Sequence, residues 1–213
     1  MGLRHTALAG VVVMACLALA GCGGDHGRTC PGGPDMSGRA VSGGDLTQGK
    51  LRCVNLERST LDNEEFREAN LSAANLHRAQ LNGASLENVD LSGADLTNAS
   101  VESAKLTGVD FARADLGNAS LAKSRLEDVG LSQTRLEHAN LRGTVALRSD
   151  LAGADVRDAD LTGAWLSDSN LRGARLDGAD LSQVTWSNVV CPDGSKSAGE
   201  SRESCDGHMT PAR

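Results

Sequence analysis

The stretch from Ala69 to Leu76 reads Ala-Asn-Leu-Ser-Ala-Ala-Asn-Leu and contains successive copies of a five-residue unit. The unit continues without a break, so that from Leu46 to Trp186 every fifth residue belongs to one register of 29 positions. Of these, 23 are Leu, five are Phe, Val or Trp, and one is the shortened Ala146. Two residues earlier lies a small side chain, which is Ala in 15 of the 29 units. An internal repeat this short has to be interpreted before any single residue.

The period of five excludes the two simplest regular structures. Five residues advance an α-helix by about 500°, which distributes the leucines around the whole circumference and leaves no apolar stripe. On a straight strand an odd period sends successive leucines to opposite faces. A short extended segment followed by a corner avoids both problems, because the small residue and the Leu two positions later then both point inward. The pattern therefore predicts a chain that coils around its own core.

The remaining positions of the unit predict corners and an outer surface. Two residues after the Leu the chain often has a residue that tolerates positive φ at low cost. These corner residues are Asn63, Gly83, Asn88, Gly93, Asn98, Gly108, Asn118, Gly143, Gly153, Gly163 and Gly173. Directly before the Leu lies an outward position that is frequently Asp or Asn, whose side chains bond to nearby backbone. Aspartates at these positions are thus explained by the repeat itself.

The stretches 69–76 and 93–99, the second of which reads Gly-Ala-Asp-Leu-Thr-Asn-Ala, resemble the pentapeptide repeat family. This resemblance implies an all-β fold, a right-handed quadrilateral β-helix in which four pentapeptides form one square coil. Residues 36–190 would make seven to eight such coils, spaced by about 4.8 Å as in a strand ladder. The open ends of such a solenoid need caps, and Trp186 at the last register position is expected to serve as one.

The amino terminus resembles a bacterial lipoprotein signal. An apolar run ends in Leu-Ala-Gly-Cys at 19–22, so residues 1–21 are expected to be removed and Cys22 to carry the lipid, including palmitate. Residues 22–35 are rich in Gly and Pro and are expected to be a flexible tether. A secretory signal without lipid is the alternative. The expected location is the cell membrane, lipid-anchored, on its extracytoplasmic face.

The other cysteines favour an exported protein. Without Cys16 in the signal and the lipidated Cys22, an even number remains, which favours disulfides in an exported chain. The remaining four are Cys30, Cys53, Cys191 and Cys205, the last two within the tail of residues 191–213. Three pairings are possible, of which proximity favours Cys30 with Cys53 and Cys191 with Cys205. Zinc is the competing interpretation, but no closely spaced Cys pair remains to hold it. We expect no metal and no cofactor.

Catalysis and DNA mimicry are two further function classes. None of the five His lies at a recognisable spacing from a nucleophile or metal partner, so we expect no enzyme. Some members of the resembled family imitate duplex DNA and bind DNA gyrase, a type II topoisomerase. Residues 36–190 carry 22 acidic and 16 basic side chains, a net charge of only −6, and the two signs are interspersed. An exported lipoprotein would also never meet gyrase, and no nucleic acid is expected as a partner.

One group of residues departs from the repeat. With 20 residues per coil, Val145 and Trp165 share one outward column on adjacent coils, and Leu147 lies beside them, where polar residues are usual. The same column continues with two basic residues, Lys105 and Arg125. A local irregularity, in which Leu147 turns inward to replace Ala146 while Trp165 packs over it, is one interpretation. The other is a contact site for a protein of the envelope, since exposed aromatic residues often anchor interfaces.

Together these features predict a membrane-anchored, extracytoplasmic scaffold or protein-binding rod. Its expected partners are the membrane, through the lipid on Cys22, and a protein of the envelope. The rod is expected to be a monomer or an end-to-end dimer. The gyrase-binding alternative predicts instead a cytoplasmic chain without lipid.

Overall fold

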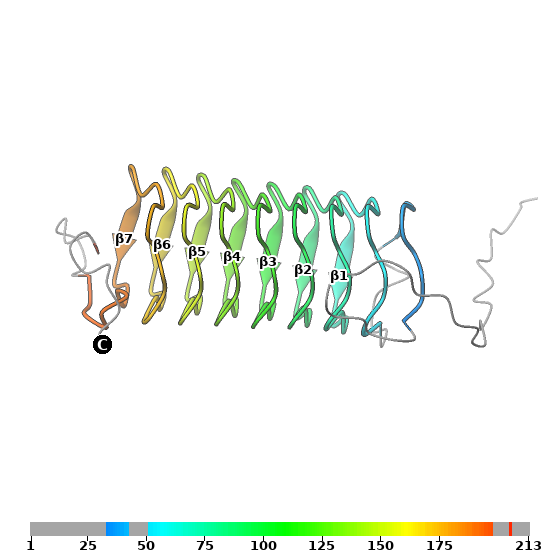
Figure 1. The fold of residues 1–213 in the computed structure, drawn as a ribbon, viewed down its shortest axis with the longest axis horizontal. Helices are drawn as coiled ribbons and strands as arrows, with labels where there is room; N and C mark the ends of the chain where they lie inside the picture. Colours follow the sequence, from blue (N-terminus) through cyan, green and yellow to red (C-terminus); the bar gives the residue numbers. More distant parts are fainter. Residues whose placement is uncertain (1–32, 43–50, 198–204, 206–213) are drawn as a thin grey trace, which may run out of the picture.

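The chain forms a straight rod of stacked coils in the computed structural model, which describes residues 33–42, 51–197 and 205 (Figure 1). Each coil contributes one three-residue strand to a seven-stranded parallel sheet with the order β1-β2-β3-β4-β5-β6-β7. The strands are β1 (Glu65–Arg67), β2 (Ser85–Glu87), β3 (Lys105–Thr107), β4 (Arg125–Glu127), β5 (Val145–Leu147), β6 (Trp165–Ser167) and β7 (Thr185–Ser187). Each residue of β1 to β6 pairs with the residue 20 positions later, as Phe66 does with Leu86. One coil is therefore four pentapeptides.

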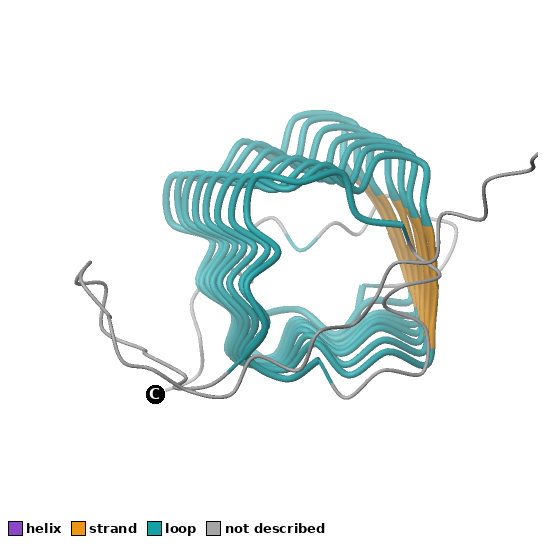
Figure 2. Ribbon diagram, turned by 90° about the vertical axis from the view of Figure 1, so that its right-hand side faces the viewer, coloured by secondary structure: helices purple, strands orange, loops and turns teal. Residues whose placement is uncertain are grey.

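The other three sides of each coil are joined by single parallel bridges rather than strands. Asn55 pairs with Asn75, Thr60 with Gln80, and Asn70 with Asp90, again at a separation of 20 residues. Viewed along the rod, the four sides form a square outline with the strands on one side (Figure 2). The all-β, quadrilateral β-helix expected from the sequence is thus confirmed.

Tight turns make the corners after the three sides without strands. The backbone N–H of Val54 donates to the carbonyl of Leu51 at 3.0 Å, and φ of the intervening Cys53 is 63°. A positive φ at the third residue only is the geometry of a type II turn. All eleven Gly and Asn residues predicted to occupy corners have positive φ. So do residues such as Arg58 and Ala73, which shows that the stacked coils impose this conformation even on side chains that disfavour it.

The core is a column of leucines flanked by a second column of small residues. Leu56, Leu76 and Leu96 are at most 1% exposed, and Ala74 and Ala94 are equally buried. Where the small residue is a Ser or Thr, its hydroxyl finds a partner inside the rod. The Oγ1 atoms of Thr134 and Thr144, for example, each donate to a carbonyl 23 residues earlier, both at 2.9 Å. Buried hydroxyls therefore add bonds between coils instead of costing stability.

A disulfide fastens the carboxyl-terminal end. Cys191 and Cys205 are bonded, with their Cα atoms 5.5 Å apart, and both are fully buried. The pairing expected from proximity is correct here. The chain after the last coil folds back on it through an antiparallel bridge between Val190 and Lys196. Trp186 packs against the core nearby but keeps part of its surface accessible, so it covers the end of the column only partly.

Candidate protein-binding surface

The outward surface of the seven strands, which we call the strand face, holds the three apolar residues that depart from the repeat. In β5, Val145 and Leu147 point outward on either side of the inward Ala146. Trp165 of β6 pairs with Val145, and Ser167 pairs with Leu147. Trp165 is 50% exposed and is the single large hydrophobic side chain that is exposed in the described part of the chain. Val145 and Trp165 are register neighbours and Leu147 lies two residues from Val145 on the same face, and we call these three residues the apolar patch.

The inward turn of Leu147 considered from the sequence is wrong. Ala146 faces the core and is 6% exposed, whereas Leu147 stays on the outside in register with Glu127 and Ser167. The reason is that side chains alternate along a strand. Turning Leu147 inward would slip the register by one residue and send both neighbours to the wrong side. The strand keeps its pairing and accepts a gap in the core.

A small apolar cavity marks this gap. It has a volume of about 20 Å³. Its lining comprises Leu121, Leu126, Leu131, Leu136, Leu141, Thr144, Ala146, Leu151, Leu161, Ala164 and Leu166. This volume is about that of one water molecule's probe sphere, and a lining this apolar favours an empty site. The cavity is a packing defect under the patch and is too small for an organic ligand.

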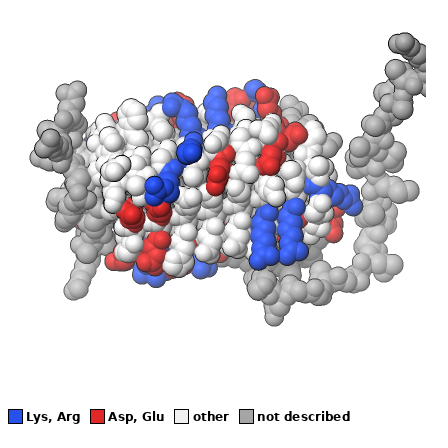
Figure 3. Space-filling view, turned by 90° about the horizontal axis from the view of Figure 1, so that it is seen from above, with Lys and Arg blue, Asp and Glu red and all other residues white. Residues whose placement is uncertain are grey.

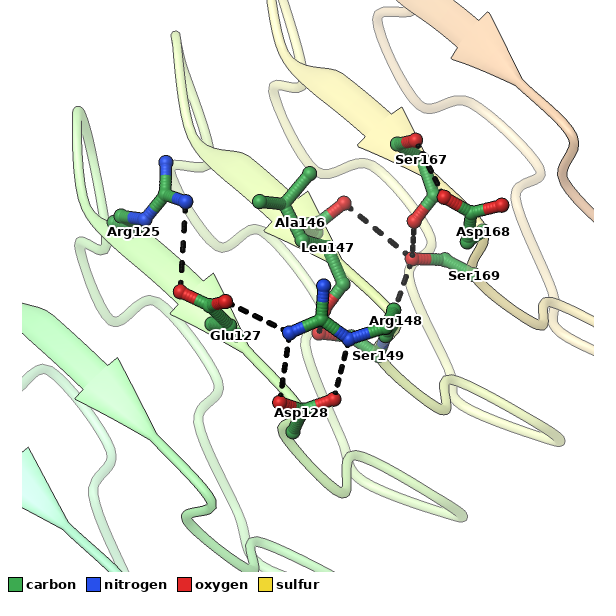
Figure 4. Close-up of polar contacts among 10 residues, drawn as sticks. All are labelled: Arg125, Glu127, Asp128, Ala146, Leu147, Arg148, Ser149, Ser167, Asp168 and Ser169. Carbon is green, nitrogen blue, oxygen red and sulfur yellow. Dashed lines mark hydrogen bonds and ion pairs between the residues drawn. The ribbon is translucent and has the colours of Figure 1, made fainter.

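An arginine clamp borders the patch on the corner side (Figure 4). The guanidinium of Arg148 donates to both carboxylate oxygens of Asp128, each at 2.8 Å, and to Oε1 of Glu127 at 2.7 Å. Arg125 lies on the other side of Glu127 at 3.4 Å. Hydrogen bonds from Arg148 lower the pKa of both Glu127 and Asp128, so the two carboxylates are ionised at neutral pH.

The sequence interpretation did not identify this clamp. Arg148 and Asp128 occupy the same corner position of successive coils, 20 residues apart. Reading the sequence in columns of 20 could have found the pair, because an Arg one coil above an Asp is within reach of a bidentate contact. The clamp holds the rim of the patch in one arrangement.

Basic side chains continue the patch along the rod. Lys105 and Arg125 occupy the same outward column as Val145 and Trp165, one coil apart at each step, and both are exposed. The strand face therefore presents Lys105 on β3, the pair of Arg125 and Glu127 on β4, and the three apolar residues on β5 and β6. Aromatic residues and Arg are enriched at protein interfaces.

The acidic residues on the side of the rod opposite the strand face are largely paired with arginines. Arg135 lies 3.3 Å from Asp115 and 3.1 Å from Glu137. Asp155 accepts from Arg157 at 2.7 Å, and this bond is the main cause of its lowered pKa. In Figure 3 basic and acidic side chains are interspersed on the face shown. The surface in this region has no uniform negative field of the kind that would imitate DNA.

The histidines of the rod are not arranged for chemistry. His77 contacts the hydroxyl of Thr97 through Nδ1 at 2.7 Å, and His138 occupies a corner with φ of 59°. Within residues 33–42, 51–197 and 205, no group of three His, Cys, Asp or Glu side chains could hold a metal ion.

Two of the predicted cysteine sites lie outside the described residues. Cys22 and Cys30 belong to the segment 1–32, so lipidation and the pairing of Cys30 stay predictions. Cys53 is itself disulfide-bonded. Over the described part of the chain, no helix has the length and apolar character needed to cross a membrane.

Comparison with known proteins identifies the family. The model of the pentapeptide repeats matches in eight copies, whose ranges together span residues 50–185. A comparison with curated protein sequences gave no match.

Similar solved structures include HetL, a pentapeptide repeat protein involved in heterocyst differentiation regulation in the cyanobacterium Nostoc. It is 28% identical, with a TM-score of 0.24, over 76% of this chain and 89% of HetL. QnrB1, a plasmid-mediated fluoroquinolone resistance protein, is 17% identical with a TM-score of 0.28, over 71% of this chain and 91% of QnrB1. A pentapeptide repeat protein from the thylakoid lumen of Arabidopsis thaliana is 24% identical with a TM-score of 0.21, over 60% of this chain and 68% of its own. Since the family model covers more than half of the 213 residues, the chain belongs to the pentapeptide repeat family.

Proposed function

We propose that this protein is a non-enzymatic, protein-binding rod that a lipid on Cys22 holds at the extracytoplasmic face of the cell membrane. The observation that carries the proposal is the apolar patch of Val145, Leu147 and Trp165 on the strand face. Polar residues are usual at these outward positions, and half of the Trp165 side chain stays exposed. A binding partner would gain from it, because Trp is enriched among residues that dominate interface energies.

The rigidity of the rod supports this role. Val145 and Trp165 sit on strands that are hydrogen-bonded to coils on both sides, and Arg148 fixes the corner beside them. A surface held in one conformation loses little entropy when it binds, so even a small patch contributes affinity.

Two features support the extracytoplasmic location. The first is the signal-like segment 1–21, which ends before Cys22. The second is the buried disulfide between Cys191 and Cys205, a bond that persists in oxidising compartments and is rare in the cytosol. The tether 22–35 would hold the rod just off the membrane.

The location is tested by mass spectrometry of the protein from membrane and soluble fractions of the native cell. We expect an acylated Cys22 as the first residue, in the membrane fraction. An intact, unlipidated Met1 in the cytosol would overturn the anchored location and favour the gyrase-binding alternative.

Binding is tested by placing a photoreactive amino acid at position 165 or at position 175 of the full chain in its native membrane. Arg175 occupies the equivalent outward position on another side of the rod and is 51% exposed, so it is a matched control. We expect a defined cross-linked product from position 165 and none from position 175. Equal products from both, or none from either, contradict binding through the patch.

A further inference from the structure

We propose that the strand face binds a second copy of this chain, in a parallel dimer whose twofold axis runs along the rods. This inference rests on the proposed function in two respects, the strand face as a protein-binding surface and the lipid that holds both chains in one membrane; it names the partner. The pattern of outward residues on β1–β7 carries it.

A twofold axis that runs parallel to the rods, between two apposed strand faces, has a simple geometric consequence. Each coil faces the same coil of the partner, while the strand direction is reversed. The first residue of each three-residue strand therefore faces the third residue of the same strand in the partner. Such an interface is isologous, so every contact occurs twice.

The seven strands satisfy this requirement coil by coil. Glu65 would face Arg67 of the second copy, and Arg125 would face Glu127, so charges of opposite sign meet. Val145 would face Leu147, which places apolar against apolar. The other four strands pair Ser85 with Glu87, Lys105 with Thr107, Trp165 with Ser167, and Thr185 with Ser187. No described strand would place like charges, or a charge and an apolar residue, opposite each other.

The apolar patch would become the centre of a closed core. Trp165 lies one coil beyond Leu147 in the stack, a step of about 4.8 Å, so its indole can cover Leu147 of the second copy. Twofold symmetry repeats this contact and brings six apolar side chains together. The Trp that is half exposed in one rod is then buried at the centre of the interface, where binding energy concentrates.

An antiparallel arrangement fits less well. If the two patches meet around β5 with the rods reversed, β1 and β2 extend beyond the contact, and their outward Glu65 and Arg67 are left without a partner surface. The amino-terminal ends would also point in opposite directions. Two chains anchored in one membrane by the proposed lipid need their amino termini at the same end, as the parallel dimer provides.

The size of the contact predicts a weak dimer in solution. Seven three-residue strands about 4.8 Å apart form a face of roughly 34 Å by 10 Å, or about 340 Å² on each copy. The total of about 700 Å² is below the roughly 1,000 Å² that a stable specific interface buries. Anchoring in one membrane raises the effective concentration and would favour association without new contacts. The test therefore uses the full chain in its native membrane.

Two tagged forms of the full chain are co-expressed, one with Thr185→Cys and the other with Ser187→Cys, and treated with a short bismaleimide. Both positions lie on β7 and are neighbours across the interface only in the parallel dimer. The control pair is Thr185→Cys with Lys105→Cys, which would meet in an antiparallel dimer centred on β5. We expect the mixed cross-link from the first pair and none from the control. A cross-link from the control pair alone overturns the parallel arrangement.

Two further variants test the chemistry of the contact. Trp165→Ala, which removes a half-exposed side chain, should lower the cross-linked fraction about tenfold, whereas Arg175→Ala should leave it unchanged. Glu65→Arg should weaken the cross-link by opposing two arginines, and adding Arg67→Glu should restore part of it, because this second change also removes the bond from Arg67 to Glu87 of the same chain. An unchanged yield with Trp165→Ala refutes the interface.

The failure of the dimer and the failure of the proposed function give different results. If neither cysteine pair is cross-linked but the photoreactive residue at position 165 captures a different protein, the second copy is overturned while the binding function stands. If position 165 captures nothing, both are overturned.

Discussion

Replacing Ala146 by Leu should stabilise the rod, because the shortened residue leaves a gap that the neighbouring coils do not fill. Ala146 lies between Leu126 and Leu166 in the ladder of inward residues, and all three occupy the same register position. The coils on both sides of Ala146 therefore already have Leu at this position with the same spacing. The apolar cavity of about 20 Å³ lies where the missing carbons would be.

The magnitude follows from the three carbons that Leu adds to Ala. At about 0.8 kcal/mol for each buried CH₂ group, the transfer from water contributes about 2.4 kcal/mol. Ordering the Leu side chain costs about 0.5–1 kcal/mol. The free energy of unfolding should thus rise by about 1.5–2 kcal/mol, which is close to the lower end of the loss seen for the reverse change in other cores.

The assay is denaturant unfolding, with amide hydrogen exchange of β4, β5 and β6 to localise the effect, because repeat rods need not unfold in one step. The control is Ala164→Leu. Ala164 lines the same cavity but belongs to the column of small residues, where Leu should overpack the interior and cost about 1–3 kcal/mol. A loss of stability with Ala146→Leu would refute the reasoning and mean that the neighbours cannot make room. A gain from both variants would mean that the interior is loosely packed throughout.

Three other changes test the fold. Asp155→Asn should cost up to about 1 kcal/mol at pH 7, because the hydrogen bond from Arg157 lowers the pKa of Asp155 below its ordinary 3.8. This contribution is present above about pH 4 and is lost as pH falls through the lowered pKa, so the difference between wild type and variant in urea unfolding should shrink in acid. Replacing Cys191 and Cys205 by Ser removes their bond across 14 residues without reducing the one at Cys53; it should cost about 3 kcal/mol and speed hydrogen exchange in the last coil but not in the central ones. Gly163→Ala should cost about 1 kcal/mol in thermal unfolding, because φ is 68° with nothing within 4 Å of the new Cβ; an unchanged midpoint would show that the corner conformation carries no strain.

The fold was predictable in nearly every respect, because the repeat specifies it redundantly. Leu71, Leu91 and their equivalents fix the core, and Gly or Asn at positions such as Gly83 and Asn98 fix the corners. What the pattern could not give is the division of the four sides into one with strands and three with single bridges. One sequence difference is that the small residue after the strand side is Val at Val89, Val109 and Val129, where the other sides mostly have Ala, and the period of five does not show what this difference means for the backbone.

The candidate surface was predictable in its location but not in its detail. Val145, Leu147 and Trp165 were visible as departures from the repeat, and the structure brings them together on adjacent strands. The interpretation with Leu147 turned inward assumed that filling the core position stabilises the chain more than keeping the strand in register. The structure keeps the hydrogen-bonded register of β5 and leaves a small cavity, because a small cavity costs less than shifting a strand by one residue against two neighbours. Arg148 was missed because its partners lie about one coil away in the sequence.

The positions of the repeat that the fold does not fix indicate where binding residues can lie in such a rod. In each pentapeptide, the core takes the Leu and the small residue before it, and the corner takes a third position. Only the outward positions are free to vary, and residues 20 apart, such as Lys105 and Arg125, become neighbours along one column. The residues of a binding surface on one side of the rod are therefore spaced by 20 in the sequence. In this chain the outward residues that the repeat does not explain lie on β5 and β6, directly over the one shortened core residue. Because Val145, Leu147 and Trp165 lie on these two adjacent strands, the strand face is where a partner should be sought.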